Sequence, residues 1–253
     1  MKKCAIVDVK GGLGNQLFTI SFAQYLKNND YKVFVDTSFY NSSHDYPRKL
    51  YIDIEKFGFN RINLKSDRIF KLIKTRYEEV ENFTNLNTKI LNRFKGYYQD
   101  TAFLDKKYLI DKLSLQNKKS EESVMVHIRR GDYIGLNEDL KLEYYSTAIN
   151  KLEKKLGGCE ITIFTDDHSL KIEDFENFNV TRLLNDKNDD VLETFKKMTQ
   201  FQNFIISNST FSFLAAFLGQ EKDSTIYYPY PWMRNSNVQI KNFPKEWIQI
   251  TNN

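Results

Sequence analysis

Short apolar segments rich in β-branched residues recur along the sequence, and each one stops at glycine or at a polar cluster. Segments of this length and composition are typical of buried strands, and apolar residues at helical spacing lie between them. Because parallel strands need a crossover connection, usually a helix, the alternation predicts an α/β fold of doubly wound units. The expected strands are 4–9, 32–36, 123–128, 160–165, 204–207 and 225–229, and the expected helices are 15–26, 143–155, 189–200 and 211–218.

The α/β pattern weakens in the middle of the chain. Charged, helix-compatible stretches lie around 66–81, and a further helix is expected after 96–99. The polar stretch 116–122 is typical of a linker. A chain of 253 residues is long enough for two small domains. We therefore expect two α/β domains, residues 1–118 and 119–253.

The charge balance limits the classes of partner. The chain has 37 basic and 33 acidic residues, a formal charge of +4, and its lysines are scattered rather than striped. This balance argues against a nucleic-acid-binding module and leaves a weak preference for anionic ligands or an anionic membrane surface. Cys4 and Cys159 have no metal or redox spacing. With no secretory signal and no apolar run of about 18 residues, we expect a cytoplasmic protein.

Polar clusters follow several of the expected strands. They are Gly11–Asn15, His127–Asp132, Asp166–Asp167 and Asn208–Thr210. Ligands of open α/β sheets gather at the carboxyl ends of the strands. The clusters therefore predict a shared ligand-binding edge, with the glycine turn contributed by the facing domain.

Arg129 and Arg130, directly after an expected strand, are the most informative pair. Guanidinium groups form paired, charge-assisted hydrogen bonds to phosphate oxygens and stay charged at any working pH. Beside Gly131, they are suited to bind a diphosphate and to stabilise charge on a leaving nucleotide. The alternative is a surface pair bridged to acids. His127 has two open interpretations, a core histidine or a ligand contact.

The glycine turn argues against two common nucleotide-binding classes. Gly12 and Gly14 resemble the start of a dinucleotide fingerprint, but Leu17 stands at the third glycine position and no P-loop motif is present. A Rossmann dehydrogenase or an NTPase is therefore disfavoured. The glycines still allow a ligand close to the backbone, and Asn15 offers a neutral hydrogen-bonding group at a helix N-terminus.

Two further clusters have more than one interpretation. Asn208–Thr210 is typical of a helix cap and also of a phosphate site. Asp166 and Asp167 are candidates to accept hydrogen bonds from ribose hydroxyls or from a base. A metal role for them needs further acidic ligands, and the chain has no Asp-x-Asp motif.

In these polar clusters the sequence resembles glycosyltransferase family 11, the α-1,2-fucosyltransferases. The resemblance spans nearly the whole chain through spaced motifs that stand in the family's order. They are Gly11–Phe18, Gly96–Gln99, His127–Tyr133, Phe164–Asp167 and Ile206–Ser212. Each motif is moderately specific, whereas five in order are highly specific.

The resemblance implies a GT-B fold, in which two Rossmann-like domains face each other across a cleft. The N-terminal domain would be the acceptor side, the C-terminal domain would bind the donor, and the last segment would pack back on the N-terminal domain. The implied reaction moves L-fucose from GDP-β-L-fucose to the 2-hydroxyl of a galactoside with inversion, without metal or cofactor. The implied setting is O-antigen or other surface-glycan synthesis, with a lipid-linked acceptor at the inner face of the membrane.

The same resemblance assigns site residues. It implies that Arg129 and Arg130 contact the diphosphate of the donor. The implied catalytic residues are Arg129, Asp132, His127 and Asn15, and the general base is left open between Asp132 and His127. The implied donor-binding residues are Gly12, Gly14, Asn15, His127, Arg129, Arg130, Asp166, Asp167, Asn208, Ser209, Thr210 and Phe211. The rivals are a transferase for another nucleotide sugar and a carbohydrate-binding protein without catalysis.

Two segments depart from the family pattern. Thr19-Ile20-Ser21 stands where family members often carry Gln-Tyr-Ala, and Phe213-Leu214 replaces paired tryptophans. We expect the first departure to change acceptor contacts and the second to repack the core.

Overall fold

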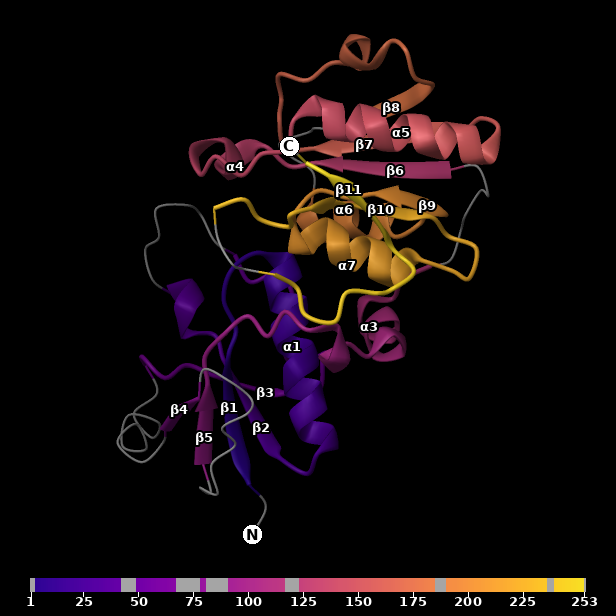
Figure 1. Ribbon diagram of the computed structural model, residues 1–253. Coiled ribbons are helices and arrows are strands. Elements are labelled where there is room, and N and C mark those ends of the chain that lie inside the picture. The colour runs from indigo at the N-terminus through magenta and orange to yellow at the C-terminus, as the bar shows by residue number, and fades with distance from the viewer. Residues whose placement is uncertain are drawn as a thin grey trace. The chain divides into compact units, whose positions relative to one another are not determined.

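The computed structural model describes residues 3–41, 49–66, 78–80, 91–116, 123–184, 190–235 and 239–252, with only the backbone for 78–80. The chain divides into an N-terminal unit, Met1–Lys112, and a C-terminal unit, Leu113–Asn253. Figure 1 labels the elements of both units. The predicted division after residue 118 falls within 117–122, outside the described residues.

The N-terminal unit is built on a parallel sheet with the strand order β3-β2-β1-β5-β4. The order reverses between β1 and β5, so the turns that follow these two strands meet at one point of the sheet edge. The strands are β1 (Cys4–Asp8), β2 (Lys32–Asp36), β3 (Asn60–Ile62), β4 (Glu78–Val80) and β5 (Leu91–Phe94), and the helices are α1 (Leu13–Asn28), η1 (Ser38–Asn41), η4 (Thr101–Phe103) and α3 (Lys106–Leu113).

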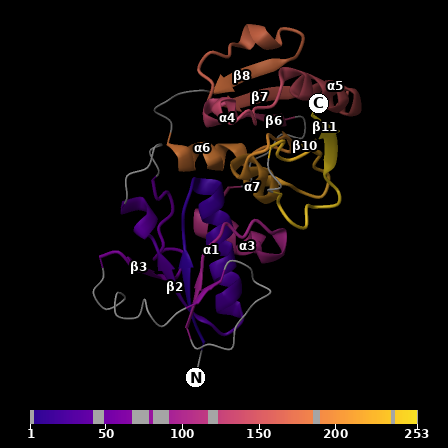
Figure 2. The same cartoon turned by 60° about the vertical axis from the view of Figure 1, so that its left-hand side comes forward.

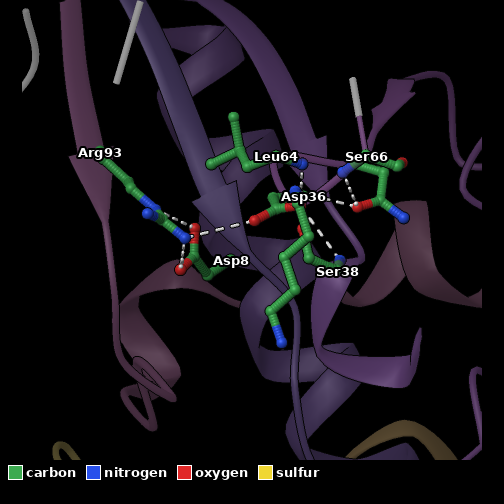
Figure 3. Close-up of polar contacts among 8 residues, drawn as sticks. Asp8, Asp36, Ser38, Leu64, Ser66 and Arg93 are labelled. Atoms are coloured by element: carbon green, nitrogen blue, oxygen red, sulfur yellow. Dashed lines mark hydrogen bonds and ion pairs between the residues drawn. The ribbon is translucent and has the colours of Figure 1, made fainter. Parts of the chain in front are cut away.

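A buried group of charges joins three strand ends of the N-terminal unit, as Figure 3 shows. Arg93 on β5 binds both carboxylate oxygens of Asp8 at 2.7 Å, and its Nη2 lies 3.3 Å from Asp36. The other oxygen of Asp36 accepts N–H groups of Ser38 and Leu64 at 3.0 and 3.1 Å. Burial raises the pKa of Asp8 above its ordinary value, although Arg93 opposes the rise. Asp36 thus holds the turns that follow β2 and β3.

The C-terminal unit is built on a parallel sheet with the order β11-β10-β9-β6-β7-β8. The chain winds outward from β6 in one direction and from β9 in the other, so the switch point lies between these strands. The strands are β6 (Ser123–Ile128), β7 (Glu160–Thr165), β8 (Val180–Leu184), β9 (Asn203–Ile205), β10 (Ile226–Tyr230) and β11 (Ile248–Thr251), and the helices are α4 (Gly131–Gly135), α5 (Leu142–Leu156), η5 (Ile172–Phe175), α6 (Val191–Met198) and α7 (Thr210–Gly219).

Helices cover both faces of this sheet, with α5 on one side and α6 and α7 on the other (Figures 1 and 2). Side chains of a strand alternate between faces. Val124, Val126 and Ile128 of β6 therefore join the apolar core that includes α5. His127 points to the opposite face, where its ring lies 5.8 Å from that of Phe211 on α7.

The expected strands and the four helices expected with defined bounds are present, each within two residues of its predicted ends. The stretch expected to be helix-compatible, 66–81, is partly outside the described residues, and its described end forms β4 instead. β4, with the sequence Glu-Glu-Val, is the last strand of its sheet and pairs only with β5 among the described strands. Within the described part of the chain, no helix has the length and apolarity to cross a membrane.

Candidate functional site

The polar clusters of the C-terminal unit meet at the carboxyl ends of β6, β7 and β9. The turn after β6 carries Arg129 and Arg130 into α4, and Asp166–Asp167 follows β7 directly. Asn208 and Ser209 come between β9 and α7. Since β6 and β9 flank the switch point, the sheet topology brings together side chains that are far apart in the sequence.

Arg129 is held by two carboxylates. Its Nη1 lies 2.6 Å from Asp166 Oδ2, and its Nη2 donates to Asp132 Oδ1 at 2.6 Å. Its guanidinium carbon lies 5.5 Å from the ring centre of Tyr133. Burial works against the charge of Arg129, but the two carboxylates outweigh it and raise the pKa of the guanidinium. Arg129 is therefore a fixed cation with a defined orientation.

Asp166 connects Arg129 to the backbone of the same turn. Its Oδ1 accepts the N–H groups of Arg130 and Gly131 at 2.8 and 3.2 Å, while Oδ2 binds Arg129. A Cβ at Gly131 would lie 2.4 Å from Oδ2. Glycine is thus needed at 131 because the carboxylate occupies the space of a side chain. Asp166 therefore supports Arg129 and the turn after β6, and its expected contact with the nucleoside stays a prediction.

Arg130 is paired in a similar way. Its Nη1 donates to Asp167 Oδ2 at 2.8 Å, and its Nε lies 3.8 Å from Asp139 Oδ2. Asp167 Oδ1 accepts both the N–H and the hydroxyl of Ser169, at 2.9 and 2.6 Å. Burial would raise the pKa of Asp167, but the hydrogen bonds from Ser169 and Arg130 lower it overall. Asp167 is therefore ionised and already shared between two partners.

Both arginines are thus bridged to acids, as the surface-pair alternative expected. These contacts do not use all of the N–H groups of the two guanidinium groups. A guanidinium has five N–H groups. Asp132 and Asp166 accept two from Arg129, and Asp167 accepts one from Arg130. Asp139, at 3.8 Å from Nε of Arg130, pairs with its charge without accepting a hydrogen bond. The remaining side-chain N–H groups of both arginines have no partner among the described residues. These groups can bind oxygen atoms of an anion without breaking the ion pairs.

His127 is a buried, neutral residue. Its side chain is 6% exposed, and Nδ1 lies 2.8 Å from Ser207 Oγ. Burial lowers the pKa of His127 to about 3, so the ring carries no charge near neutral pH. Ser207 Oγ in turn lies 3.3 Å from Ser212 Oγ on α7. The structure supports the core-histidine interpretation, in which His127 links β6 to the start of α7.

The cluster at the start of α7 is a helix cap. Ser209 Oγ accepts the N–H of Phe211, and Phe211 packs against His127 and Phe195. Asn208 is 2% exposed, and its Nδ2 donates to the carbonyl of Glu138 at 2.8 Å. The cap interpretation is thereby confirmed, and the start of α7 lies beside His127.

The glycine turn of the N-terminal unit has its own geometry. Gly11 has a φ of +82°, and a Cβ there would press on Asn15 and Tyr97. Gly12 precedes α1, and a Cβ there would meet open space. Gln99, after β5, donates to Asn15 Oδ1 at 2.9 Å, which joins two of the sequence motifs at the switch point of this sheet.

Beside this turn, Tyr97 is 40% exposed, and Lys10 Nζ lies 4.9 Å from its ring centre. Neither residue was predicted as a site residue. Tyr97 stands in the Gly96–Gln99 motif, and its place after a strand is the signal that could have found it. Asp139 and Ser207 were not predicted either: Asp139 lies in the loop after α4 and contacts Arg130, and Ser207 follows β9 and contacts His127 on β6.

Both departures from the family pattern are buried. Thr19, Ile20 and Ser21 are at most 1% exposed, and the two hydroxyls donate to carbonyl groups within α1. The expectation that they change acceptor contacts is therefore not supported by their positions. Phe213 packs against Trp232 and Trp247, so tryptophans from later segments fill the core around it, which agrees with the expected repacking.

Among the residues that the structure describes, no group of three or more His, Cys, Asp or Glu has an arrangement that could hold a metal ion.

Two curated relatives come from Escherichia coli. The α-1,2-colitosyltransferase is 24% identical over 97% of this chain and 98% of its own length. The O-antigen biosynthesis glycosyltransferase WbnK is also 24% identical, over 96% of this chain and 99% of its own length.

Among solved structures, POFUT1 in complex with GDP matches with a TM-score of 0.51 and 11% identity, over 90% of this chain and 98% of that chain. This likeness concerns the fold, which is α/β of the GT-B type. The model of glycosyl transferase family 11 matches residues 50–251. The chain therefore belongs to glycosyltransferase family 11.

Proposed function

We propose that this glycosyltransferase moves L-fucose from GDP-β-L-fucose to the 2-hydroxyl of a galactoside, with inversion at the anomeric carbon. The observation that carries the proposal is the anchored pair Arg129 and Arg130 at the switch point of the C-terminal sheet, with side-chain N–H groups left for an anion. Family membership supports the transfer reaction, and the α-1,2 linkage in the name of one relative supports the position of attack.

The proposed reaction is a single displacement. The acceptor oxygen attacks the anomeric carbon while the bond from that carbon to the GDP oxygen breaks, and GDP leaves with the bonding electrons. Arg129 and Arg130 stabilise the negative charge that develops on the diphosphate. Because their orientation is set before the donor binds, little reorganisation is needed during the reaction. In this proposal the guanidinium groups supply the positive charge that a metal would otherwise supply.

The acceptor hydroxyl loses its proton as the new bond forms, and in this proposal water takes up that proton. His127 is buried and hydrogen-bonded to Ser207, and Asp132 is bound to Arg129. We therefore propose that both residues support the site: His127 holds the start of α7 and Asp132 orients Arg129. Asn15, with Gln99 and Tyr97, lies at the switch point of the N-terminal sheet and is proposed to contact the acceptor sugar.

The proposed setting is surface-glycan synthesis, with a lipid-linked, galactose-containing acceptor. One relative is named for O-antigen biosynthesis, which supports this setting. The name of the other relative raises the second candidate, transfer of colitose in the same α-1,2 linkage.

A donor panel tests the proposal. Wild-type protein is incubated with a β-galactoside and one nucleotide sugar at a time, in EDTA, and release of the nucleotide is measured. We expect release from GDP-fucose that requires the acceptor and is lost in Arg129→Ala. Losing one charge-assisted contact in the transition state should cost about 2–4 kcal/mol. Faster turnover of another nucleotide sugar would show that GDP-fucose is not the donor. Near-normal activity of Arg129→Ala would refute the proposed role of Arg129 in stabilising the leaving group.

A further inference from the structure

Beside the arginine pair, one buried carboxylate joins separate segments of the C-terminal unit. Glu138 lies between α4 and α5 and is 4% exposed. Its Oε2 accepts the backbone N–H of Arg234 at 2.7 Å, and its Oε1 accepts that of Asn235 at 2.8 Å. Both oxygens of a buried charge are therefore used by a segment almost a hundred residues later in the chain.

The backbone of Glu138 extends this group. Its N–H donates to the carbonyl of Tyr133 at 2.9 Å, and its carbonyl accepts Nδ2 of Asn208 at 2.8 Å. Tyr133 in turn donates its hydroxyl to the carbonyl of Asn208 at 3.2 Å. We call Glu138 with Tyr133, Asn208, Arg234 and Asn235 the Glu138 clasp. It ties the loop after α4 to the end of β9 and to the segment after β10.

Both arginines depend on this loop. Tyr133, whose ring lies beside Arg129, directly follows Asp132, the carboxylate that binds Arg129. Asp139, which directly follows Glu138, contacts Arg130. The clasp therefore fixes the loop close to the points where it touches each guanidinium.

We propose that Glu138 is a positioning residue of the donor site: its carboxylate locks the loop 131–139 onto 234–235 and so sets the orientation of Arg129 and Arg130. This inference rests on the proposed function, since the group being positioned is the pair that would bind the donor diphosphate. A purely structural role for Glu138 predicts something different, a loss of stability that leaves nucleotide affinity unchanged.

Glu138→Gln tests the proposal with almost no change of shape. The amide keeps one acceptor oxygen and places an NH₂ group against the second backbone N–H. Asp36→Asn in the N-terminal unit is the matched control, because Asp36 is 3% exposed and also accepts two backbone N–H groups. Glu138→Asp, which keeps the charge but is one methylene shorter, is a milder second variant in case the glutamine variant does not fold.

On the full chain, GDP affinity is measured by calorimetry and amide hydrogen exchange is followed without nucleotide. Denaturant unfolding and steady-state kinetics are measured alongside. We expect both Glu138→Gln and Asp36→Asn to unfold at lower denaturant concentration. Only Glu138→Gln should bind GDP more weakly, by about tenfold, which corresponds to the loss of one charge-assisted hydrogen bond. In this variant KM for the donor should rise more than kcat falls. The backbone N–H groups of Arg130 and Gly131 donate to Asp166. Only Glu138→Gln should lose protection from hydrogen exchange at these two amides.

The outcomes distinguish a failure of the proposed function from a failure of the proposed role of Glu138. Absence of GDP binding by the wild type would refute the proposed function, and hydrogen exchange would still test the clasp. GDP affinity equal to that of Asp36→Asn, or unchanged exchange at Arg130 and Gly131, would overturn the role of Glu138 and leave the proposed function standing.

Discussion

Replacing Gly131 with alanine should damage the site although it favours the local helix. Gly131 begins α4, and its φ lies outside the left-handed region, so the backbone accepts alanine without strain. Alanine is more favourable than glycine by about 1 kcal/mol in a helix interior, which is an upper limit for the gain at this first helical position. The added Cβ, however, would lie 2.4 Å from Asp166 Oδ2, whereas ordinary contact begins at 3.4 Å.

The carboxylate of Asp166 must therefore retreat by about 1 Å, which stretches its 2.6 Å contact with Arg129 beyond hydrogen-bonding distance. A hydrogen bond to a charged group contributes about 1.5–3 kcal/mol. Both side chains are more than a quarter exposed, so solvent screening favours the lower end of that range. We expect kcat/KM to fall roughly 10- to 30-fold.

Gly135→Ala is the matched control, because it lies at the other end of α4 and a Cβ there meets nothing within 4 Å. Steady-state release of nucleotide from the donor is measured for both variants, together with their unfolding curves. Gly135→Ala should retain wild-type activity, and Gly131→Ala should lose activity without losing comparable stability. Equal activities of the two variants would show that the contact between Asp166 and Arg129 does not set the rate.

Three further predictions concern other residues. Ser209→Ala removes the cap of α7 and should lower the free energy of unfolding by about 1 kcal/mol, measured by urea denaturation; an unchanged midpoint would refute the cap. His127 titrates at a pKa of about 3 in the folded chain against an ordinary 6.5, so the unfolded chain takes up the proton first as pH falls. Stability should therefore decrease below about pH 6.5, by up to about 1.4 kcal/mol per pH unit, and His127→Gln should flatten that decrease; equal slopes for the two proteins would contradict the burial argument. Tyr97→Ala should raise KM for the acceptor and leave KM for the donor unchanged, and the reverse pattern would remove Tyr97 from the acceptor side.

The sequence alone predicted the elements whose pattern is strong. The buried strands β1, β6 and β7 are mostly apolar and rich in β-branched residues, and α1 and α5 carry apolar residues at helical spacing. The missed strands β3, β4, β5, β8 and β11 are short or polar, and pairing with a neighbouring strand, rather than composition, makes them strands.

The position of the site was also predictable, but its internal contacts were not. Strand-end clusters placed Arg129, Asp166 and Asn208 at one edge because parallel strands end on the same side. No spacing rule indicated that Asp166 binds Arg129 or that Glu138 accepts N–H groups from residues 234–235. Those contacts depend on strand order and on loop paths, which tertiary packing decides.

The most direct test of the proposed function is the chemical structure of the glycoside that the enzyme makes. Protein incubated with GDP-fucose and a β-galactoside should yield one new glycoside, and NMR should show an α-L-fucosyl group on O2 of galactose, with far less product from Arg129→Ala in the same time. A β-linkage, attachment at another hydroxyl, or failure to transfer fucose to any galactoside while another nucleotide sugar is consumed would contradict the proposed function.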